Sequence, residues 1–229
     1  MGRPLRIQAP NTLFHVINRG NGRQRIFRAP RDYREYLDLI ARFKEKFDIR
    51  LYHFVLMTNH VHLLLEAVRA DGALSGFMQG LTLAHTRRFN ARYKSVGHVW
   101  QGRFKSILID RDAYFLQCGR YIELNPVRAK MVRHPSEYPW SSYPVYAAGA
   151  PSGIVDVHPM YEDLGKTPGV RQRRYRDDME REHIATRKQR AQRFSVEQVY
   201  GSDAFLQRAH REFGLSSFHR GPGRPKNQT

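Results

Sequence analysis

The sequence predicts an α+β protein whose core is a ferredoxin-like split β-α-β sheet. Hydrophobic residues make up 41% of the 229 residues, which is enough to build a core. Apolar side chains alternate in some segments, as in strands, and recur every three or four residues in others, as in helices. The first six segments follow the order β-α-β-β-α-β. That order is typical of a four-stranded antiparallel sheet with two helices on one face.

The first three segments are expected to form a strand, a loop and a helix. Residues 12–18 are rich in β-branched and aromatic residues, which favour a strand. Residues 18–23 contain two glycines and two asparagines, which indicate a tight loop. Residues 31–47 predict a helix, because their apolar side chains share one face and charged side chains lie opposite.

A hairpin, two helices and a last strand follow. Residues 51–57 and 60–66 are β-like runs separated by a two-residue turn, which predicts a hairpin. Residues 74–93 have the apolar spacing of an amphipathic helix, and residues 99–109 predict the fourth strand. Residues 112–124 predict a third helix, which can pack on the sheet face that the first two helices leave open.

Changes in composition divide the chain into three parts. Residues 1–134 hold the predicted sheet and its helices, and form the first domain. Residues 135–168 are rich in proline and predict a linker or a wrapped arm. Residues 169–229 predict a basic, mainly helical extension that ends in a flexible tail. Within it, residues 195–213 are expected to be a small helical appendage.

The charge balance indicates a polyanionic partner. The chain has 39 Lys and Arg against 21 Asp and Glu, a formal net charge of +18. Nucleic acid is the usual partner of so basic a surface, because its phosphates neutralise the repelling charges. An anionic membrane is the competing partner, but no basic stretch is joined to a lipid-anchor motif.

Cysteine content and hydropathy indicate a soluble, cytoplasmic protein. Cys118 is the single cysteine, so neither an intrachain disulfide nor a cysteine zinc cluster can form. The longest apolar runs, such as residues 63–65, are too short to cross a bilayer. The first residues lack the apolar stretch of a signal peptide.

Two histidines form the first candidate site. His60 and His62 lie two residues apart at the start of a predicted strand, so their side chains share a face. Two imidazoles in that arrangement can chelate one divalent metal. The alternative is structural: His60 packs in the turn, and His62 is half-buried and hydrogen-bonded.

A tyrosine and an asparagine form the second candidate site. Tyr121 and Asn125 are four residues apart on a predicted helix and therefore share a face. A phenol, with its pKa of about 10, is a poor nucleophile unless a neighbour such as a metal stabilises the phenolate. Alternatively, Tyr121 packs at the edge of the core. In that reading Asn125 caps a new helix that begins with Pro126.

Tyr114 is a second candidate nucleophile. It precedes Tyr121 by seven residues and lies on nearly the same helix face. Cys118 stands four residues after Tyr114, where the other pair has an asparagine. A packing role is therefore favoured for Tyr114.

Several motifs occur together in the order of one known family. They are Arg3-Pro-Leu-Arg-Ile7, Phe14-His-Val-Ile-Asn-Arg-Gly20, Met57-Thr-Asn-His-Val-His-Leu-Leu-Leu65, Gly97-His-Val-Trp-Gln-Gly-Arg-Phe-Lys-Ser106 and Tyr121-Ile-Glu-Leu-Asn-Pro-Val-Arg-Ala129. Over residues 1–145 the chain resembles the REP-associated tyrosine transposases, relatives of the insertion-sequence transposases that move as single strands.

The resemblance implies a role for each candidate residue. His60 and His62 match the paired metal-binding histidines of the "HUH" motif, and Tyr121 matches the catalytic tyrosine. Asn125 falls where relatives place an amide as a third metal ligand. The implied reaction is DNA transesterification through a 5′-phosphotyrosine, with Mg²⁺ or Mn²⁺ as cofactor and no small-molecule cofactor. The implied partner is single-stranded or hairpin DNA, such as REP-like palindromes. The choice between monomer and homodimer stays open.

The expected DNA-binding side chains combine cations with an aromatic surface, a mixture that suits unpaired bases. They are Arg19, Trp100, Gln101, Arg103, Lys105 and Arg128. Ordinary core packing is the alternative for Trp100.

Three other functions remain open on the sequence. A nucleic-acid-binding protein without catalysis can have the same fold, with the histidines as structural residues. A replication or plasmid-transfer nicking enzyme would share the chemistry. A structural zinc protein is least favoured, because the chain offers one cysteine and no second close histidine pair.

Overall fold

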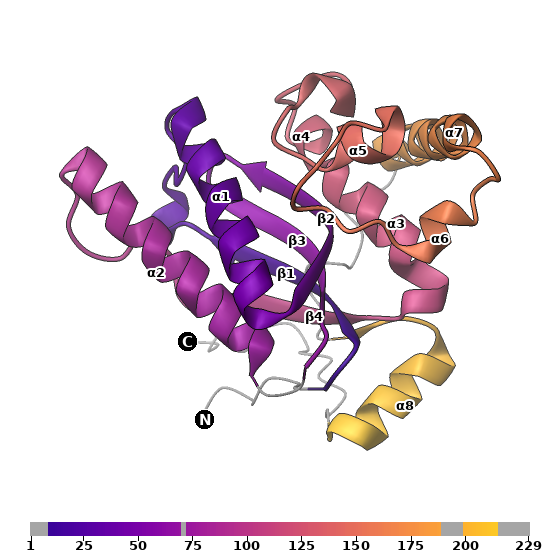
Figure 1. Cartoon of the computed structure of the whole chain (residues 1–229), viewed down its shortest axis with the longest axis horizontal. Coiled ribbons are helices and arrows are strands. Elements are labelled where there is room, and N and C mark those ends of the chain that lie inside the picture. Colours follow the sequence, from indigo (N-terminus) through magenta and orange to yellow (C-terminus); the bar gives the residue numbers. More distant parts are fainter. Residues whose placement is uncertain (1–8, 70–71, 189–198, 215–229) are drawn as a thin grey trace, which may run out of the picture.

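The computed structural model describes residues 9–69, 72–188 and 199–214, and has helices on both faces of a sheet (Figure 1). The strand order is β2-β3-β1-β4-β5. The strands are β1 (Thr12–Arg19), β2 (Ile49–Met57), β3 (His60–Ala67), β4 (Lys105–Ile109) and β5 (Val199–Tyr200). β1 pairs antiparallel with β3 and with β4, and β2 pairs antiparallel with β3. These four strands confirm the predicted split β-α-β arrangement.

The prediction of a four-stranded sheet was one strand short. β5 pairs in parallel with β4, aligning Val199 with Leu108 and Tyr200 with Ile109. The segment was expected to be wholly helical, and α8 (Asp203–Phe213) confirms that for its second half. A two-residue strand has no alternation for a sequence pattern to reveal. It forms because the edge of β4 offers backbone partners: the Asp110 N–H donates to the Tyr200 carbonyl at 2.9 Å.

The strand predicted over residues 99–109 is shorter than expected, since β4 begins at Lys105. Trp100 forms only an isolated bridge with Gly20. Its indole N–H donates to the carbonyl of Thr82 at 3.2 Å. The tryptophan side chain therefore turns toward the neighbouring helix. Its backbone still pairs with the end of β1, and bends at residues 101–103 separate this bridge from β4.

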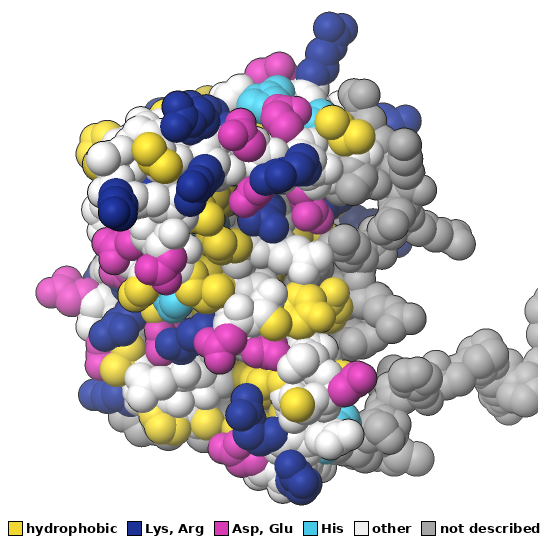
Figure 2. All heavy atoms as spheres, turned by 90° about the vertical axis from the view of Figure 1, so that its right-hand side faces the viewer, with side chains coloured by type: hydrophobic (Ala, Val, Ile, Leu, Met, Phe, Trp, Pro, Cys, Tyr) yellow, Lys and Arg dark blue, Asp and Glu magenta, His cyan; other side chains and the backbone are white. Residues whose placement is uncertain are grey.

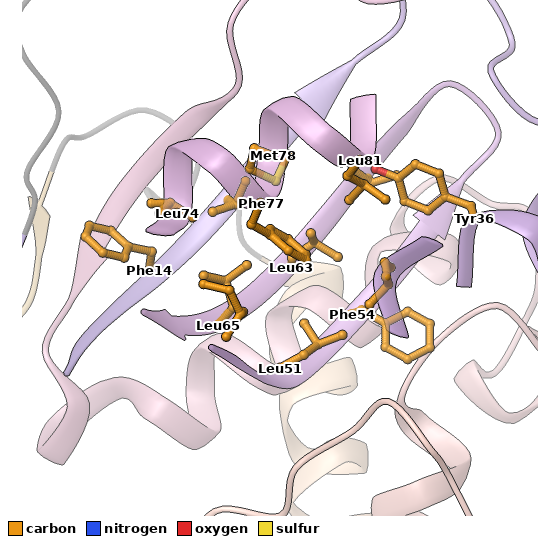
Figure 3. Close-up of a cluster of buried hydrophobic side chains, with 14 of the residues drawn as sticks. Phe14, Tyr36, Leu51, Phe54, Leu63, Leu65, Leu74, Phe77, Met78 and Leu81 are labelled. Carbon is orange, nitrogen blue, oxygen red and sulfur yellow. The ribbon is translucent and has the colours of Figure 1, made fainter. Parts of the chain in front are cut away.

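Helices α1 (Pro30–Phe47) and α2 (Ala73–Tyr93) cover one face of the sheet, as predicted (Figure 1). Alternate strand residues point at them and form the larger hydrophobic core (Figure 3). Among its members are Phe14, Tyr36, Leu51, Phe54, Leu63, Leu65, Leu74, Phe77, Met78 and Leu81. The 3-10 turn η1 (Asn21–Arg23) lies in the predicted loop between β1 and α1.

Two glycines let α1 and α2 pack closely. A Cβ on Gly76 would lie 2.4 Å from the Phe47 ring, and one on Gly80 would lie 2.6 Å from the Phe43 ring. A larger residue at either position would force the phenylalanine ring or the helix to shift. The glycines in this helix are therefore explained by packing, despite their low helix propensity.

Helix α3 (Arg111–Glu123) packs on the opposite sheet face and is followed directly by α4 (Asn125–Arg128). The remaining strand side chains point toward α3 and form a second hydrophobic cluster that includes Leu64, Ile107 and Tyr121. The predicted third helix is thus confirmed within one residue at each end, on the face that was expected to be open.

The proline-rich segment is a wrapped arm in this structure. It contains η2 (Pro135–Glu137), α5 (Tyr143–Ala148) and α6 (Pro159–Glu162). The Leu56 N–H donates to the Trp140 carbonyl at 2.9 Å, and the Leu51 N–H donates to the Asp156 carboxylate at 2.8 Å. The arm therefore satisfies polar groups along β2, the outer strand of the sheet.

The basic helix α7 (Pro168–Lys188) follows the arm and lies beside α5 (Figure 1). Tyr175 and Met179 are fully buried with Leu124 and Tyr146 in a third hydrophobic cluster. The basic helix thus also contributes an apolar face to the fold.

In the part of the chain that the structure describes, no helix is long and apolar enough to cross a membrane. The motif at residues 3–7, the segment 189–198 and the basic tail at 221–226 lie outside the described residues.

Candidate active site

The histidine pair lies on the face of β3 that α3 covers. Val61, Leu63 and Leu65 point into the core under α1 and α2, which directs His60 and His62 to the opposite face. The centroids of the two imidazole rings are 5.0 Å apart, at an interplanar angle of 74°. His62 is buried, with 4% of its surface exposed, and His60 is half-buried.

Each of these histidines has one ring nitrogen engaged by a neighbour. The Nδ1 atom of His60 lies 2.6 Å from the side-chain oxygen of Asn59. The Nδ1 atom of His62 lies 2.8 Å from Nε2 of His15. His15 is fully buried on β1.

His15 is not among the site residues that the sequence predicts. Its position in the middle of a predicted strand gave no reason to join it to residues 60–62. The topology supplies that reason, because β1 lies beside β3 with Ile17 opposite His62. His15, two residues before Ile17, therefore shares the sheet face of His62.

Tyr121 on α3 lies over this group of histidines. Its ring meets His62 edge-on at a centroid distance of 6.4 Å, and His15 at 6.0 Å. Tyr121 is 4% exposed. Tyr114, the other candidate, contacts Tyr200 of β5 edge-on at 4.9 Å. The structure therefore brings Tyr121, from a distant part of the sequence, to the histidine pair.

Asn125 is held at the junction of α3 and α4. Its side-chain nitrogen donates to the carbonyls of Tyr121 and Ile122, both at 3.0 Å. The N-cap position of α4 is Leu124, and no side chain caps that helix. The suggested N-cap role of Asn125 is therefore wrong: the side chain satisfies the carbonyls that end α3. Its Oδ1 atom is the one that can bind a metal.

Arg128 lies against the candidate nucleophile. Its guanidinium carbon is 4.4 Å from the centroid of the Tyr121 ring, and its Nη1 donates to the Tyr121 carbonyl at 2.6 Å. Burial lowers the pKa of Arg128 from its usual value. The sequence predicts a DNA contact for this side chain, and the structure places it, partly buried, in contact with Tyr121.

The two histidines are neutral near pH 7. Burial, and next the positive charge of Arg19, lowers the pKa of His60 to about 4. Burial also holds the pKa of His62 well below its usual value, with the neighbouring His15 and His60 acting in the same direction. A neutral imidazole has the lone pair that a metal requires, so neither ligand must lose a proton near pH 7.

His60, His62 and Asn125 offer donor types that suit a divalent metal. Within the described ranges, no three His, Cys, Asp or Glu side chains are grouped as a metal site. The candidate set instead combines two imidazoles from His60 and His62 with the amide oxygen of Asn125. Imidazole suits transition metals, and amide oxygen and water suit Mg²⁺ and Mn²⁺.

Four of the predicted DNA-binding side chains are exposed on two neighbouring segments. They are Arg19, Gln101, Arg103 and Lys105. The segments are joined by backbone hydrogen bonds: the Gln101 N–H donates to the Arg19 carbonyl and the Asn21 N–H to the Val99 carbonyl. Residues 19–31 and 87–109 contain no acidic residue.

Trp100 is 9% exposed and lies 5.5 Å from the ring of His85. It belongs to the core, so its ring has no open face on which a base could stack. Its residue type indicated a stacking platform, but its side chain fills the space between the sheet and α2.

A comparison with family models decides the identity of the chain, since residues 8–125 match the model described as "Transposase IS200 like". This chain is an IS200-like transposase. The match extends over more than half of the chain, and it includes His15, both candidate metal-binding histidines, Tyr121 and Asn125.

One solved structure supports the fold of this transposase. A REP-associated tyrosine transposase bound to a REP hairpin has a TM-score of 0.54 and 20% identity, covering 69% of this chain and 93% of its own. A Deinococcus radiodurans R1 protein solved at 1.90 Å is 20% identical, with a TM-score of 0.38, over 53% of this chain and 96% of its own. No curated protein sequence matches the chain.

The arginines of α7 in this transposase have mainly local partners. Arg171, Arg174 and Arg176 donate to the carbonyls of Gly165, Leu164 and Ala147. On the side of the molecule turned to the viewer in Figure 2, acidic and basic side chains are interleaved. The exposed cations beside His60 are therefore better placed than α7 to attract a phosphate backbone.

A buried polar cluster holds the end of α3, the helix that carries Tyr121. Glu123, two residues after Tyr121, is fully buried and accepts from the Ser142 hydroxyl at 2.6 Å and the Tyr175 hydroxyl at 2.8 Å. His53 Nδ1 lies 2.9 Å from the same carboxylate. The cluster joins β2, α3, the wrapped arm and α7, so the C-terminal helix is tied to the end of α3.

Proposed function

We propose that this transposase cuts and rejoins single-stranded DNA, with Tyr121 as the nucleophile. The observation that supports it most is the edge-on contact of the Tyr121 ring with His62, the buried member of the histidine pair. The attack of the phenolic oxygen on phosphorus forms the phosphotyrosine bond and breaks the P–O3′ bond. The phenol loses its proton, and the departing 3′ oxygen gains one. The reverse attack by a 3′-hydroxyl releases Tyr121, so no ATP is needed.

We assign the cofactor site to His60, His62 and Asn125, with Mg²⁺ or Mn²⁺ as the metal. When bound, a divalent cation would supply positive charge that polarises a non-bridging oxygen of the scissile phosphate. The protein prepares the site in two ways. Burial keeps the imidazoles neutral, and the hydrogen bonds of Asn125 fix its side chain at the end of α3.

Arg128 has a proposed role at the nucleophile. Its contact with the ring and backbone of Tyr121 restricts the orientation of the phenol. Its positive charge favours the approach of a phosphate to the same place. Arg128 thus combines the DNA contact expected from the sequence with positioning of the catalytic side chain.

The proposed substrate is single-stranded or hairpin DNA. The similar REP-associated transposase was solved with a REP hairpin. In the present chain, Arg19, Arg103 and Lys105 are exposed on joined segments that carry no acidic residue. Phosphate attraction at this surface would hold a strand near His60, because Arg19 is close enough to lower the pKa of that histidine.

Strand cleavage with and without metal tests this proposal. Labelled hairpin DNA from the flanks of the gene is incubated with protein in Mn²⁺, Mg²⁺ or EDTA. We expect metal-dependent cleavage that is lost in His60→Ala and His62→Ala. His85→Ala is the matched control, because His85 is equally buried but lies in the other core. Tight DNA binding by wild type without cleavage in any metal would overturn the proposal in favour of a non-catalytic DNA-binding protein.

A further inference from the structure

His15 is a buried polar residue that the proposed chemistry does not yet use. None of its surface is exposed. Its ring stacks on His62, with centroids 5.1 Å apart and an interplanar angle of 21°. Its Nε2 atom is 2.8 Å from Nδ1 of His62, which is hydrogen-bond distance.

The hydrogen bond between His60 and Asn59 shows how such a contact sets the tautomer of an imidazole. An amide oxygen can only accept a hydrogen bond, so Nδ1 of His60 must carry a proton and donate it to Asn59. In a neutral imidazole the other nitrogen then holds the lone pair. His60 therefore has Nε2 available as its ligand atom.

We propose that His15 is the positioning residue of the metal site, accepting a hydrogen bond from Nδ1–H of His62 so that Nε2 of His62 holds the lone pair. This inference rests on the proposed metal-dependent function. It gives both metal-binding histidines the same tautomer through different partners, Asn59 for one and His15 for the other. Partners of this kind fix the ring orientation of a ligating histidine, and their loss costs about 10–100-fold in metal affinity.

The geometry favours positioning by His15 over direct ligation. Its Nε2 atom points at a ring nitrogen of His62, and the two rings are stacked. To bind the metal through Nε2, His15 would have to give up this contact. A substitution with glutamine distinguishes the two roles of His15. The amide of glutamine can replace the imidazole as hydrogen-bond acceptor for His62, but it does not replace an imidazole that binds the metal.

Calorimetric titration with Mn²⁺ tests the proposal on the full chain without DNA. His15→Ala removes the acceptor, and we expect affinity for Mn²⁺ to fall about 10–100-fold. His15→Gln places an amide oxygen near the original Nε2 position, and we expect affinity close to wild type. Wild-type affinity in His15→Ala would overturn the proposal. An equal loss in both variants would also overturn it, by showing that the imidazole itself binds the metal.

His85→Ala is the matched control for burial. His85 is 4% exposed, its Nε2 lies 3.0 Å from the Ile26 carbonyl, and its ring contacts Tyr36 and Trp100 in the core on the opposite face of the sheet from His62. We expect its removal to lower the melting temperature and leave Mn²⁺ affinity unchanged. If His85→Ala weakens Mn²⁺ binding as much as His15→Ala does, general loosening of the fold explains the effect and the proposal fails.

A second readout separates this inference from the proposed function. Long-range ¹H–¹⁵N spectra of the metal-free protein report which ring nitrogen of His62 carries the proton. We expect Nδ1–H in wild type and in His15→Gln, and a tautomer mixture in His15→Ala. The inference fails if wild-type His62 is protonated at Nε2, even if the enzyme cleaves DNA. If wild type shows the Nδ1–H tautomer yet neither binds Mn²⁺ nor cleaves DNA, the proposed function fails and the hydrogen bond stands.

Discussion

At the scale of single residues, the candidate site depends on neutral, oriented side chains. Burial of His60 and His62 lowers their pKa values, and the hydrogen bonds at Nδ1 constrain their rings. Arg128 and Asn125 both donate to the Tyr121 carbonyl. Tyr121, the proposed nucleophile, is therefore held through its backbone and its ring.

The lowered pKa of His60 makes stability depend on pH. The pKa of His60 is about 4 in the folded protein, and its ordinary value, which applies to the unfolded chain, is 6.5. Between these two pH values the unfolded chain therefore binds a proton that the folded chain does not. We expect the free energy of unfolding to fall as pH decreases from 6.5 toward 4. In His60→Gln this decrease should be smaller. Urea denaturation at several pH values measures it, and equal pH dependence in both proteins would contradict the account.

Arg128→Ala separates a role at Tyr121 from ordinary DNA binding. The variant loses the ring contact and the hydrogen bond to the Tyr121 carbonyl. We expect at least a tenfold slower covalent step at saturating DNA, which corresponds to about 1.4 kcal/mol. Single-turnover kinetics checks this. A variant that binds DNA more weakly but reacts at the wild-type rate once saturated would limit Arg128 to DNA binding.

At the scale of elements, the sequence predicted the helices and strands that have a regular apolar periodicity. It missed the elements that form through tertiary contacts. α1, α2, α3 and the hairpin follow their apolar patterns closely. β5 is too short to show a pattern, and it depends on the free edge of β4. α5 and α6 lie in a proline-rich stretch whose turns are fixed by contacts with β2 and α7.

In the candidate site, too, local patterns predicted some residues and tertiary contacts decided the others. His60 and His62 could be paired from local spacing, because residues two apart on a strand share a face. Tyr121 was joined to them by the family resemblance, since no local spacing connects α3 with β3. His15 required the pairing of β1 with β3, which no local pattern contains. Trp100 was assigned to DNA by residue type, yet its burial depends on the position of α2.

Tyr175→Phe tests whether α7 is an integral part of the fold. The change removes a hydrogen bond to the buried carboxylate of Glu123. We expect a loss of about 1.5–3 kcal/mol in the free energy of unfolding, since the acceptor is a buried carboxylate. Tyr36→Phe is the control: its buried hydroxyl has no hydrogen-bond partner among the described residues, so we expect no loss. Equal effects of the two changes in urea denaturation would contradict this role of α7.

At the scale of the whole molecule, charge is distributed unevenly around one fold. The net charge of +18 is shared by many segments, but α7 pairs its cations with carbonyls and nearby acids. The two joined segments beside the candidate site have cations without acids. This asymmetry favours one DNA-binding face, next to the histidine pair.

Salt dependence of binding tests that asymmetry. Arg103→Gln combined with Lys105→Gln removes two cations from the joined segments. We expect weaker hairpin binding and a decrease of about 1.4 in the magnitude of the slope of log K against log salt for single-stranded contacts. Arg173→Gln, an exposed change on α7, should leave the slope unchanged. The reverse pattern, with the larger effect from Arg173→Gln, would place the DNA on the other face.

The identity of the nucleophile is the central claim, and covalent capture tests it most directly. Wild type, Tyr121→Phe and Tyr114→Phe are incubated with labelled hairpin DNA and Mn²⁺, denatured, and separated by gel electrophoresis. Any labelled adduct is then mapped by mass spectrometry. The account predicts a phosphotyrosine adduct on Tyr121 in wild type and in Tyr114→Phe, and none in Tyr121→Phe. An adduct that persists in Tyr121→Phe, or maps to Tyr114, would contradict it.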